Sequence, residues 1–332
     1  MIIQLQKNIT QSDASQLATD IQAFHIVYED ENYLITGSGV KEVPNELASK
    51  TVNNWVFPND LQLASSKFLP NKRTVQFGNV LIGGDTKNTV IIGGPCSVES
   101  EEQIRTSSTF ISGLGLKVLR GGCYKPRTSP YSFQGLGLEG LKLLAKMREE
   151  FGLTVITEVR DATHIEEVIE YSDVIQVGAK AMYDQGILRA CAKTQKPILI
   201  KRGFGTTLQE FVQAAEFVLS GGNPNVILCE RGIRTFETGT RFTLDLCGVS
   251  WLKQHTNLPI ILDPSHAMGY AYGVADLARA CVAMGIDGLL VETHPDPSVA
   301  KSDASQQLNH QDFENLITSL RPVASSVGYN IV

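Results

Sequence analysis

The segment LRGGCYKPRTSPYSFQG, residues 119–135, holds the densest group of reactive side chains in the sequence. Lys125, Arg127, Thr128 and Ser129 crowd together there beside two prolines. Arginine offers a planar fork that matches phosphate oxygens, and lysine offers a mobile point charge. Two cations and two hydroxyls, held in a loop that prolines stiffen, predict a binding site for a phosphorylated substrate.

Further cations follow apolar runs elsewhere in the chain, namely Lys180, Lys201, Arg231 and Arg234. Cations that share one site repel one another unless anionic ligands neutralise them. Together with the two cations of the loop, the set therefore indicates phosphate, and more than one phosphate group.

A second set carries the donor atoms of a transition-metal site: Cys96, His266, Glu292 and Asp303. A thiolate, an imidazole and two carboxylates suit Mn, Fe, Co or Zn, whereas Mg alone would not call for a thiolate. Taken singly, each residue has an ordinary alternative role as a buried thiol, a loop histidine or a helix-capping carboxylate. All four follow buried-strand patterns, and this shared placement favours the metal site.

Glu158, Asp263 and His294 also follow apolar runs, and we interpret them as partners that orient the metal ligands or the lysines. The cysteines other than Cys96 form no C-x-x-C pair, and we interpret them as packing residues. Cysteine usage of this kind is typical of reduced, cytosolic proteins.

Eight short apolar runs alternate with amphipathic helical patterns, such as the one that begins with capping-box spacing at residues 207–210. The runs span residues 89–94, 116–122, 153–158, 173–179, 197–203, 225–232, 259–266 and 287–294. Nearly continuous apolar runs are typical of parallel strands that are covered on both faces. Eight such units predict an α/β protein with a (β/α)8 TIM barrel, in which the loops after the strands form one shared site. An open doubly wound sheet is the alternative, but its Gly-rich fingerprint is missing after the first strand.

The first 70 residues predict a separate, small α+β domain. Strand, helix, two strands, short helix and strand follow one another there, which is typical of a ferredoxin-like fold. Residues 59–73 are predicted to be a polar linker, and residues 74–84 a β-hairpin that plugs the bottom of the barrel. We therefore expect two domains, at residues 1–70 and 71–332.

The composition fits a folded chain with a sizeable core, since 42% of its 332 residues are hydrophobic and 19% are charged. A net charge of −6 without a basic block argues against nucleic acid as a partner. The first residues lack a signal-peptide pattern, and no run of 18 apolar residues occurs. We therefore expect a cytoplasmic protein that does not interact with membranes.

Six motifs carry a resemblance to a known family: GGPCSVE, LRGGCYKPRTSPYSFQGLG, KRGF, ILCERGIRTFE, DPSH, and VETHPDP followed by KSD. With these motifs, residues 72–325 resemble the type I beta 3-deoxy-D-arabino-heptulosonate 7-phosphate (DAHP) synthases, transferases of the shikimate pathway that leads to the aromatic amino acids. The K-P-R-T-S loop followed by PYSFQG is highly specific for this family. The N-terminal module resembles an ACT-like regulatory domain in element order and length.

The resemblance implies a condensation of phosphoenolpyruvate with erythrose 4-phosphate that releases phosphate. It implies that Cys96, His266, Glu292 and Asp303 bind a divalent metal, Mn or alternatively Fe, Co or Zn, which polarises the aldehyde. Cys96 and His266 are thereby catalytic, together with Lys125 as the candidate general acid toward the aldehyde oxygen.

The resemblance also implies which residues bind each substrate. Residues expected around phosphoenolpyruvate are Arg120, Lys125, Lys180, Lys201 and Arg231, and those expected around the sugar phosphate are Arg127, Thr128 and Ser129. Asp263 is a further candidate for substrate binding. The family usually has G-A-R-N after the fourth strand, whereas this sequence reads GAKA, with Lys180 and Ala181. Lysine keeps the charge but loses the bidentate fork, so we expect weaker binding of phosphoenolpyruvate.

Other functions stay open at this point. A 3-deoxy-D-manno-octulosonate 8-phosphate synthase has the same fold and enol donor, and a paralogue could take a shifted aldose. A Schiff-base aldolase with Lys201 as nucleophile and a non-catalytic effector-binding protein are further alternatives. If the family assignment holds, an aromatic amino acid effector at the N-terminal domain and a homo-oligomer, tetramer or dimer, are expected.

Overall fold

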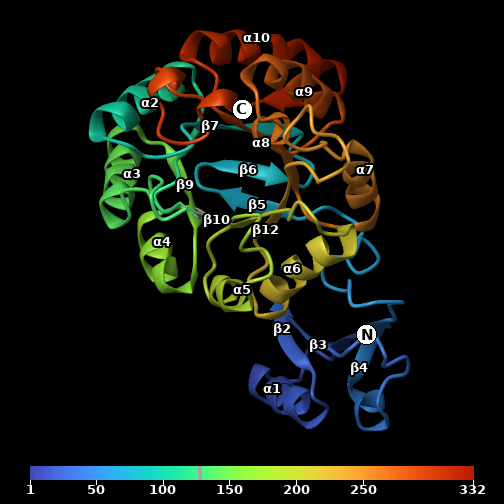
Figure 1. The fold of residues 1–332 in the computed structure, drawn as a ribbon. Helices are drawn as coiled ribbons and strands as arrows, with labels where there is room; N and C mark the ends of the chain where they lie inside the picture. The colour runs from blue at the N-terminus through green and yellow to red at the C-terminus, as the bar shows by residue number, and fades with distance from the viewer. Residues whose placement is uncertain (126–128) are drawn as a thin grey trace.

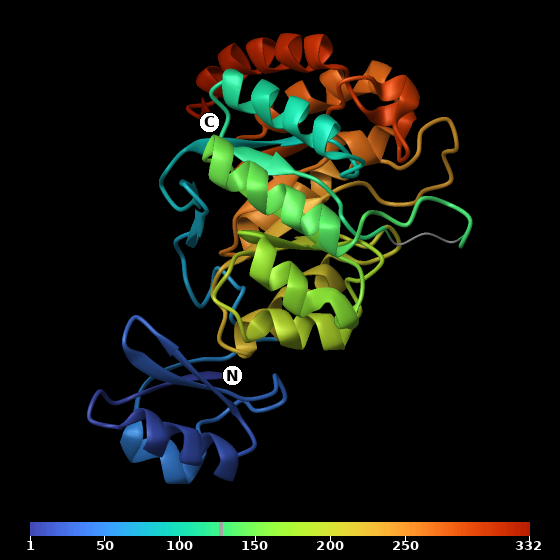
Figure 2. The ribbon, with the colours of Figure 1, turned by 90° about the vertical axis from the view of Figure 1, so that its left-hand side faces the viewer.

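The structure is a computed structural model that describes residues 1–125 and 129–332. Figures 1 and 2 show a small N-terminal domain beside a larger barrel. Arg127 and Thr128, the expected binders of a sugar phosphate, lie outside the described residues.

The larger domain is the predicted (β/α)8 TIM barrel. Within the described residues, eight parallel strands form one closed sheet, because the last of them pairs with the first. These strands are β7 (Asn88–Gly94), β8 (Val118–Arg120), β9 (Thr154–Val159), β10 (Val174–Val177), β11 (Ile198–Lys201), β12 (Val226–Glu230), β13 (Ile260–Leu262) and β14 (Gly288–Glu292). Each strand lies within one residue of its predicted run, so the barrel is confirmed and the open sheet is wrong.

Helices cover the outside of the barrel (Figure 1). They are α2 (Glu101–Gly113), α3 (Leu138–Phe151), α4 (Ile165–Tyr171), α5 (Gln185–Ala192), α6 (Leu208–Ser220), α7 (Leu246–His255), α9 (Ala271–Ala283) and α10 (His310–Ser326). Helix α6 begins with the predicted capping box, in which Thr207 accepts the backbone N–H of Glu210 and Glu210 accepts that of Thr207. The last strand, β15 (Asn330–Ile331), was not predicted and pairs with the start of β7.

A hairpin of β5 (Thr74–Phe77) and β6 (Val80–Gly83) closes one end of the barrel. Val75, Phe77 and Ile82 are fully buried and share an apolar cluster with the inward-facing side chains of the barrel strands. Figure 2 shows this hairpin at the end of the barrel opposite the long loops that follow β8 and β12. The other end of the barrel is therefore the one left open for a site.

The N-terminal domain is an antiparallel sheet with the ferredoxin-like strand order β2-β3-β1-β4. Its elements are β1 (Ile2–Leu5), α1 (Gln11–Asp20), β2 (Phe24–Tyr28), β3 (Glu31–Ile35), the 3-10 helix η1 (Asn45–Lys50) and β4 (Thr51–Trp55). A single 3-10 segment thus stands where a second α-helix was expected. Side chains such as Ile3, Ala14 and Leu34 form the core of this domain.

Residues 59–73 are not the free linker that their polar composition suggested. Leu63, Ala64 and Phe68 are buried, and the carboxylate of Glu216 on α6 accepts the backbone N–H groups of residues 62, 63 and 64. Arg73 is also buried and donates to Asn257. Apolar and polar residues are mixed in this segment without a helical or strand period, so its packing could not be predicted from the sequence.

The cysteines divide into two groups. Cys123, Cys191, Cys229 and Cys281 are buried, as expected of packing residues, whereas Cys247 is exposed on α7. The prediction for Cys247 was wrong because its apolar neighbours in sequence face the barrel while its own side chain points outward. Among the described residues, no helix is both long and apolar enough to span a membrane.

Candidate active site

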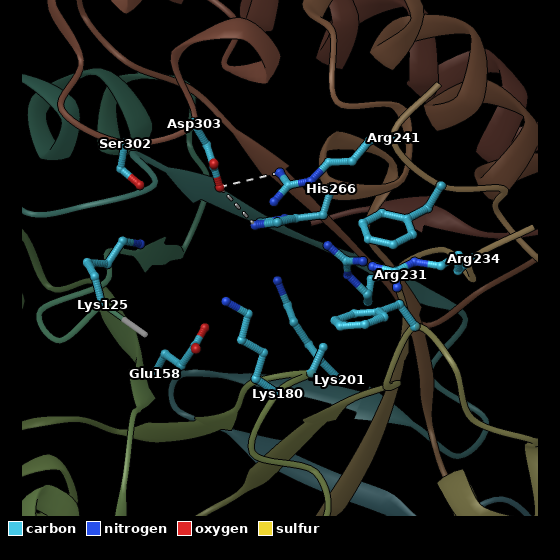
Figure 3. A pocket seen from close by; sticks show the side chains of 13 residues that line it. Lys125, Glu158, Lys180, Lys201, Arg231, Arg234, Arg241, His266, Ser302 and Asp303 are labelled. Carbon is cyan, nitrogen blue, oxygen red and sulfur yellow. Dashed lines mark ion pairs between the residues drawn. The ribbon is translucent and has the colours of Figure 1, made fainter. Parts of the chain in front are cut away.

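A cavity of about 420 Å³ opens at the carboxyl ends of the barrel strands. Figure 3 shows the side chains of Lys125, Lys180 and Lys201 directed into the same space as those of Arg231 and His266. The cavity is lined by Lys125, Glu158, Ala179, Lys180, Lys201, Phe204, Arg231, Arg234, Arg241, Phe242, His266, Ser302 and Asp303. A strongly cationic lining of this kind favours anionic ligands.

Beside the cavity, the structure brings together the four side chains that were predicted to bind a metal. We call Cys96, His266, Glu292 and Asp303 the metal-ligand group. Sγ of Cys96 and one carboxylate oxygen each of Glu292 and Asp303 all lie within 4.8 Å of one another. Nε2 of His266 lies 3.5 Å from Oε1 of Glu292 and 3.8 Å from Oδ2 of Asp303. A thiol, an imidazole and two carboxylates at these separations fit a divalent transition metal.

Different elements carry these four side chains to one place. Cys96 follows β7, Glu292 is the last residue of β14, and β7 and β14 pair directly. His266 lies in the short helix α8 (Pro264–Met268), which follows β13. Asp303 lies in the loop after β14 and has a positive φ of 47°, a conformation that aspartate tolerates better than most residues.

The electrostatics of this group depend on burial and on its neighbours. Burial, followed by the charge of Glu292, raises the pKa of the Cys96 thiol to about 11. Burial alone would raise the pKa of Asp303, but its neighbours His266, Arg241 and Lys125 lower it to about 2. The pKa of Glu292 is lowered as well, because His266 and Arg120 outweigh its burial. Both carboxylates are therefore charged at neutral pH and available to a cation.

Lys125 lines the cavity and contacts Cys96 of the metal-ligand group. Its Nζ donates to the carbonyl oxygen of Cys96 at 2.7 Å and lies 3.1 Å from Sγ of that residue. The loop is anchored just before this lysine, because the ring of Tyr124 stacks on His164 and its hydroxyl donates to Glu167. This anchoring fixes where the lysine chain begins.

Asp263 is fully buried and links a lysine to the histidine. Its Oδ2 accepts from Nζ of Lys201 at 2.6 Å and lies 2.7 Å from Nδ1 of His266. Burial would raise the pKa of Asp263, but its neighbours His266 and Lys201 hold it well below its usual range. The aspartate therefore orients Lys201 and His266, which is the role that the sequence predicted for it. It does not line the cavity.

Arg120 and Ser129 do not line the cavity as described. Arg120 is buried, and its Nη1 donates to Oε1 of Glu292 at 2.7 Å and to the carbonyl oxygen of Pro95. The hydroxyl of Ser129 accepts the backbone N–H of Tyr131 within its own loop. In this structure, therefore, the arginine contacts Glu292, a predicted metal ligand, and the serine stabilises a turn.

Of the other predicted orienting residues, Glu158 lines the cavity and His294 does not. Glu158 accepts from Nε2 of Gln176 at 2.6 Å, which holds its carboxylate beside the cavity. His294 lies 3.7 Å from Glu99 and accepts the backbone N–H of Asp296. These contacts of His294 involve neither a lysine nor the metal-ligand group.

Arginines and phenylalanines form a layered wall on the other side of the cavity. The rings of Phe204 and Phe242 stack with centroids 5.5 Å apart, Arg234 lies over Phe204, and Arg231 lies over Phe242. Arg231 is buried, which lowers its pKa, and its Nη1 has no hydrogen-bond partner among the described residues. A buried donor of this kind points to an anion that would complete it.

Sequence reasoning missed Arg241, Phe204, Phe242 and Ser302. Arg241 lies 3.6 Å from Oδ2 of Asp303 and belongs to the long loop between β12 and α7 (Figure 3). The polar residues of a barrel site are expected at strand ends, and Arg241 lies well away from the end of β12. Ser302, whose Oγ lies 3.0 Å from Sγ of Cys96, could have been noticed as the neighbour of Asp303.

Fold and site together define a (β/α)8-barrel enzyme with a cation-rich cavity beside a group of metal-ligand type. Residues 61–326 match the DAHP synthetase I family, and the chain belongs to this family.

Individual relatives agree with the family. A phospho-2-dehydro-3-deoxyheptonate aldolase of Thermotoga maritima is 43% identical over 270 residues, which are 81% of this chain and 79% of that protein. The crystal structure of a DAHP synthase from the same organism aligns over all of this chain and 98% of its own, with a TM-score of 0.80 and 35% identity. A 2-dehydro-3-deoxyphosphooctonate aldolase of Magnetococcus marinus is 34% identical over 75% of this chain and 90% of its own length.

Proposed function

We propose that this enzyme condenses phosphoenolpyruvate with erythrose 4-phosphate to give DAHP and phosphate, the first step of the shikimate pathway. The observation that carries the proposal is the position of Lys125, whose Nζ lies 3.1 Å from Sγ of Cys96 at the edge of the cationic cavity. A proton donor, a metal-ligand group and a phosphate-binding lining meet at that point. Membership of the DAHP synthetase I family supports the same reaction.

Phosphoenolpyruvate carries a carboxylate and a phosphate, and the cavity offers several cations to receive them. The cavity is lined by Lys125, Lys180, Lys201 and Arg231, and Arg231 brings a buried donor that has no partner among the described residues. Lys201 is held in place by Asp263. The phosphate of the aldose is assigned to Arg127, Thr128 and Ser129, on the strength of the sequence motif.

The reaction joins C3 of the enol to the aldehyde carbon of the sugar. Lys125 donates a proton to the aldehyde oxygen as the new carbon–carbon bond forms, so that a hydroxyl results. Water then adds to the cationic C2 and loses a proton, and the resulting tetrahedral phosphohemiketal loses phosphate by cleavage of its carbon–oxygen bond. Clustered cations hold both substrates so that the reacting carbons meet.

A divalent metal bound by Cys96, His266, Glu292 and Asp303 would supply Lewis-acid polarisation of the aldehyde carbonyl. The thiol among the ligands favours Mn, Fe, Co or Zn over Mg. Our proposal takes Mn as the first choice and the others as alternatives.

The nearest alternative reaction uses arabinose 5-phosphate in place of erythrose 4-phosphate. It is favoured by relatives that are 31% to 34% identical and are named 2-dehydro-3-deoxyphosphooctonate aldolases. The relative at 43% identity and the K-P-R-T-S loop favour erythrose 4-phosphate. Measuring phosphate release with each aldose separately decides between them, and a clear preference for arabinose 5-phosphate would contradict our proposal.

For the N-terminal domain we propose a regulatory role, with an aromatic amino acid as the effector. Its ferredoxin-like strand order is compatible with an ACT-like effector domain. We further propose that the enzyme acts in the cytoplasm as a homo-oligomer of two or four chains.

A further inference from the structure

Two consecutive buried glutamines, Gln306 and Gln307, contact residues of the metal-ligand group. Both are almost completely inaccessible to solvent. They precede Leu308, whose backbone N–H donates to the carbonyl oxygen of Glu292 at 3.0 Å. This backbone pairing, together with the bridge between Thr293 and Leu308, holds the glutamine pair alongside the end of β14.

Gln306 contacts the two carboxylates of the group directly. Its Nε2 donates to Oε2 of Glu292 at 2.6 Å and lies 3.5 Å from Oδ2 of Asp303. On its other side, Oε1 of Gln306 accepts from Nη1 of Arg241 at 2.7 Å. A guanidinium can only donate, so the amide oxygen must face Arg241 and the amide nitrogen must face the carboxylates.

Gln307 contacts the backbone around Cys96, another member of the group. Its Oε1 accepts the backbone N–H of Cys96 at 2.9 Å, and its Nε2 donates to the carbonyl oxygen of Ser302 at 2.8 Å. It thereby ties the segment that carries Cys96 to the segment that carries Asp303. Its effect on the site is therefore indirect, whereas Gln306 touches the ligand oxygens themselves.

From these contacts we propose that Gln306 is a positioning residue that holds Glu292 and Asp303 in the orientation that a divalent cation requires. The inference rests on the proposed metal-dependent function of the same site. A neutral amide suits this role because it orients two carboxylates without neutralising the charge that attracts the cation. A lysine or arginine at this position would compete with the metal for the same oxygens.

The test is the affinity of metal-free protein for Mn²⁺, measured by calorimetry without substrates. Gln306→Met keeps the length and shape of the side chain but removes both hydrogen-bonding groups. We expect it to weaken Mn²⁺ binding by roughly tenfold to a hundredfold, the loss typical of residues that orient metal ligands. Gln311→Met is the matched control, because Gln311 is exposed on α10 and its side chain donates to Asn315, away from the metal-ligand group. It should bind Mn²⁺ like the wild type.

Further measurements separate positioning from simple loss of structure. The Co²⁺-loaded Gln306→Met protein should keep its thiolate absorption from Cys96 but show altered ligand-field bands, because only the carboxylates are released. If Gln306→Met does not fold, Gln306→Asn takes its place, since the shorter amide cannot span from Arg241 to Glu292. Wild-type affinity in the folded variant overturns the inference. A wild type that binds Mn²⁺ but releases no phosphate would refute the proposed function and leave the role of Gln306 to be judged by affinity alone.

Discussion

Nζ of Lys125 lies 3.1 Å from Sγ of Cys96 and 2.7 Å from the carbonyl oxygen of the same residue. The two residues follow the neighbouring strands β8 and β7, so the pairing of these strands sets the distance between them. The lysine can therefore deliver a proton to an oxygen that approaches the metal-ligand group from the cavity. This relationship links the two halves of the proposed chemistry, the binding of phosphate and the activation of an aldehyde.

Removing a donor atom from the metal-ligand group should abolish metal-dependent phosphate release. We expect Cys96→Ala and His266→Ala to reduce it by more than roughly 100-fold, beyond the loss typical of outer partners. Circular dichroism should show an intact barrel, and the metal content after dialysis should fall. Cys191→Ala, a buried cysteine on α5 outside the cavity, is the control that should keep both metal and activity. Full activity in either ligand variant would remove the assignment.

The lysine at position 180 should limit binding of phosphoenolpyruvate. Lys180 lines the cavity where the family usually has arginine, and it lacks the planar fork that grips a phosphate. We expect Lys180→Arg to lower the KM for phosphoenolpyruvate roughly fivefold, which corresponds to about 1 kcal/mol. Lys142→Arg, on the exposed surface of α3, should change nothing. An unchanged or higher KM in the Lys180 variant would contradict the prediction that Lys180 limits binding of phosphoenolpyruvate.

Much of the fold was readable from the sequence because the barrel strands are buried on both faces. A fully buried strand such as β12 has to be a continuous apolar run, and the polar residue at its end, Glu230, marks where it stops. The short strand β15 and the packing of residues 59–73 could not be predicted, because both depend on contacts with residues that are distant in sequence. Glu216, which organises that segment, is far away in sequence and belongs to a helix of the barrel.

The site residues that could be predicted from the sequence are those that are ionisable and follow a strand. Glu292 and His266 satisfied both conditions, whereas Arg241 lies in the interior of a long loop. Gln306 has no charge and follows no strand, so only its contacts with Glu292 reveal it. Arg120 was assigned to substrate by resemblance, and only the structure shows its hydrogen bond to Glu292.

Stability should depend on pH through the contact between Glu216 on α6 and the backbone of residues 62–64. Burial, the largest influence, raises the pKa of Glu216 to about 7, although three backbone N–H groups oppose the shift. Since its ordinary pKa is 4.5, the folded protein binds this proton more tightly than the unfolded chain. The free energy of unfolding should therefore fall as the pH rises from about 5 to about 8, by on the order of 2 kcal/mol.

Glu216→Gln isolates this contribution, because glutamine has a similar shape and does not titrate. Denaturant unfolding of both proteins at about pH 5 and about pH 8 gives the comparison. We expect the wild type to lose stability relative to the variant as the pH rises. A difference between the two proteins that is the same at both pH values would exclude Glu216 as the titrating group.

The proposed effector response should be lost with the N-terminal domain. The backbone of residues 62–64 is held by Glu216 of α6, so a truncation should remove residues 1–60 and leave this contact with the barrel in place. We expect the truncated enzyme to lose inhibition by an aromatic amino acid and to keep its turnover. Phosphate release with and without each aromatic amino acid provides the measurement. A full-length enzyme that none of them inhibits would refute the proposed regulation.

The most direct test of the proposed reaction is phosphate release from phosphoenolpyruvate by the chelator-treated enzyme, before and after addition of Mn²⁺. We predict release only when erythrose 4-phosphate and Mn²⁺ are both present, with a seven-carbon keto acid phosphate as the co-product in mass spectrometry. Equal release without the aldose or without any divalent metal would contradict the account, and so would exclusive release with arabinose 5-phosphate.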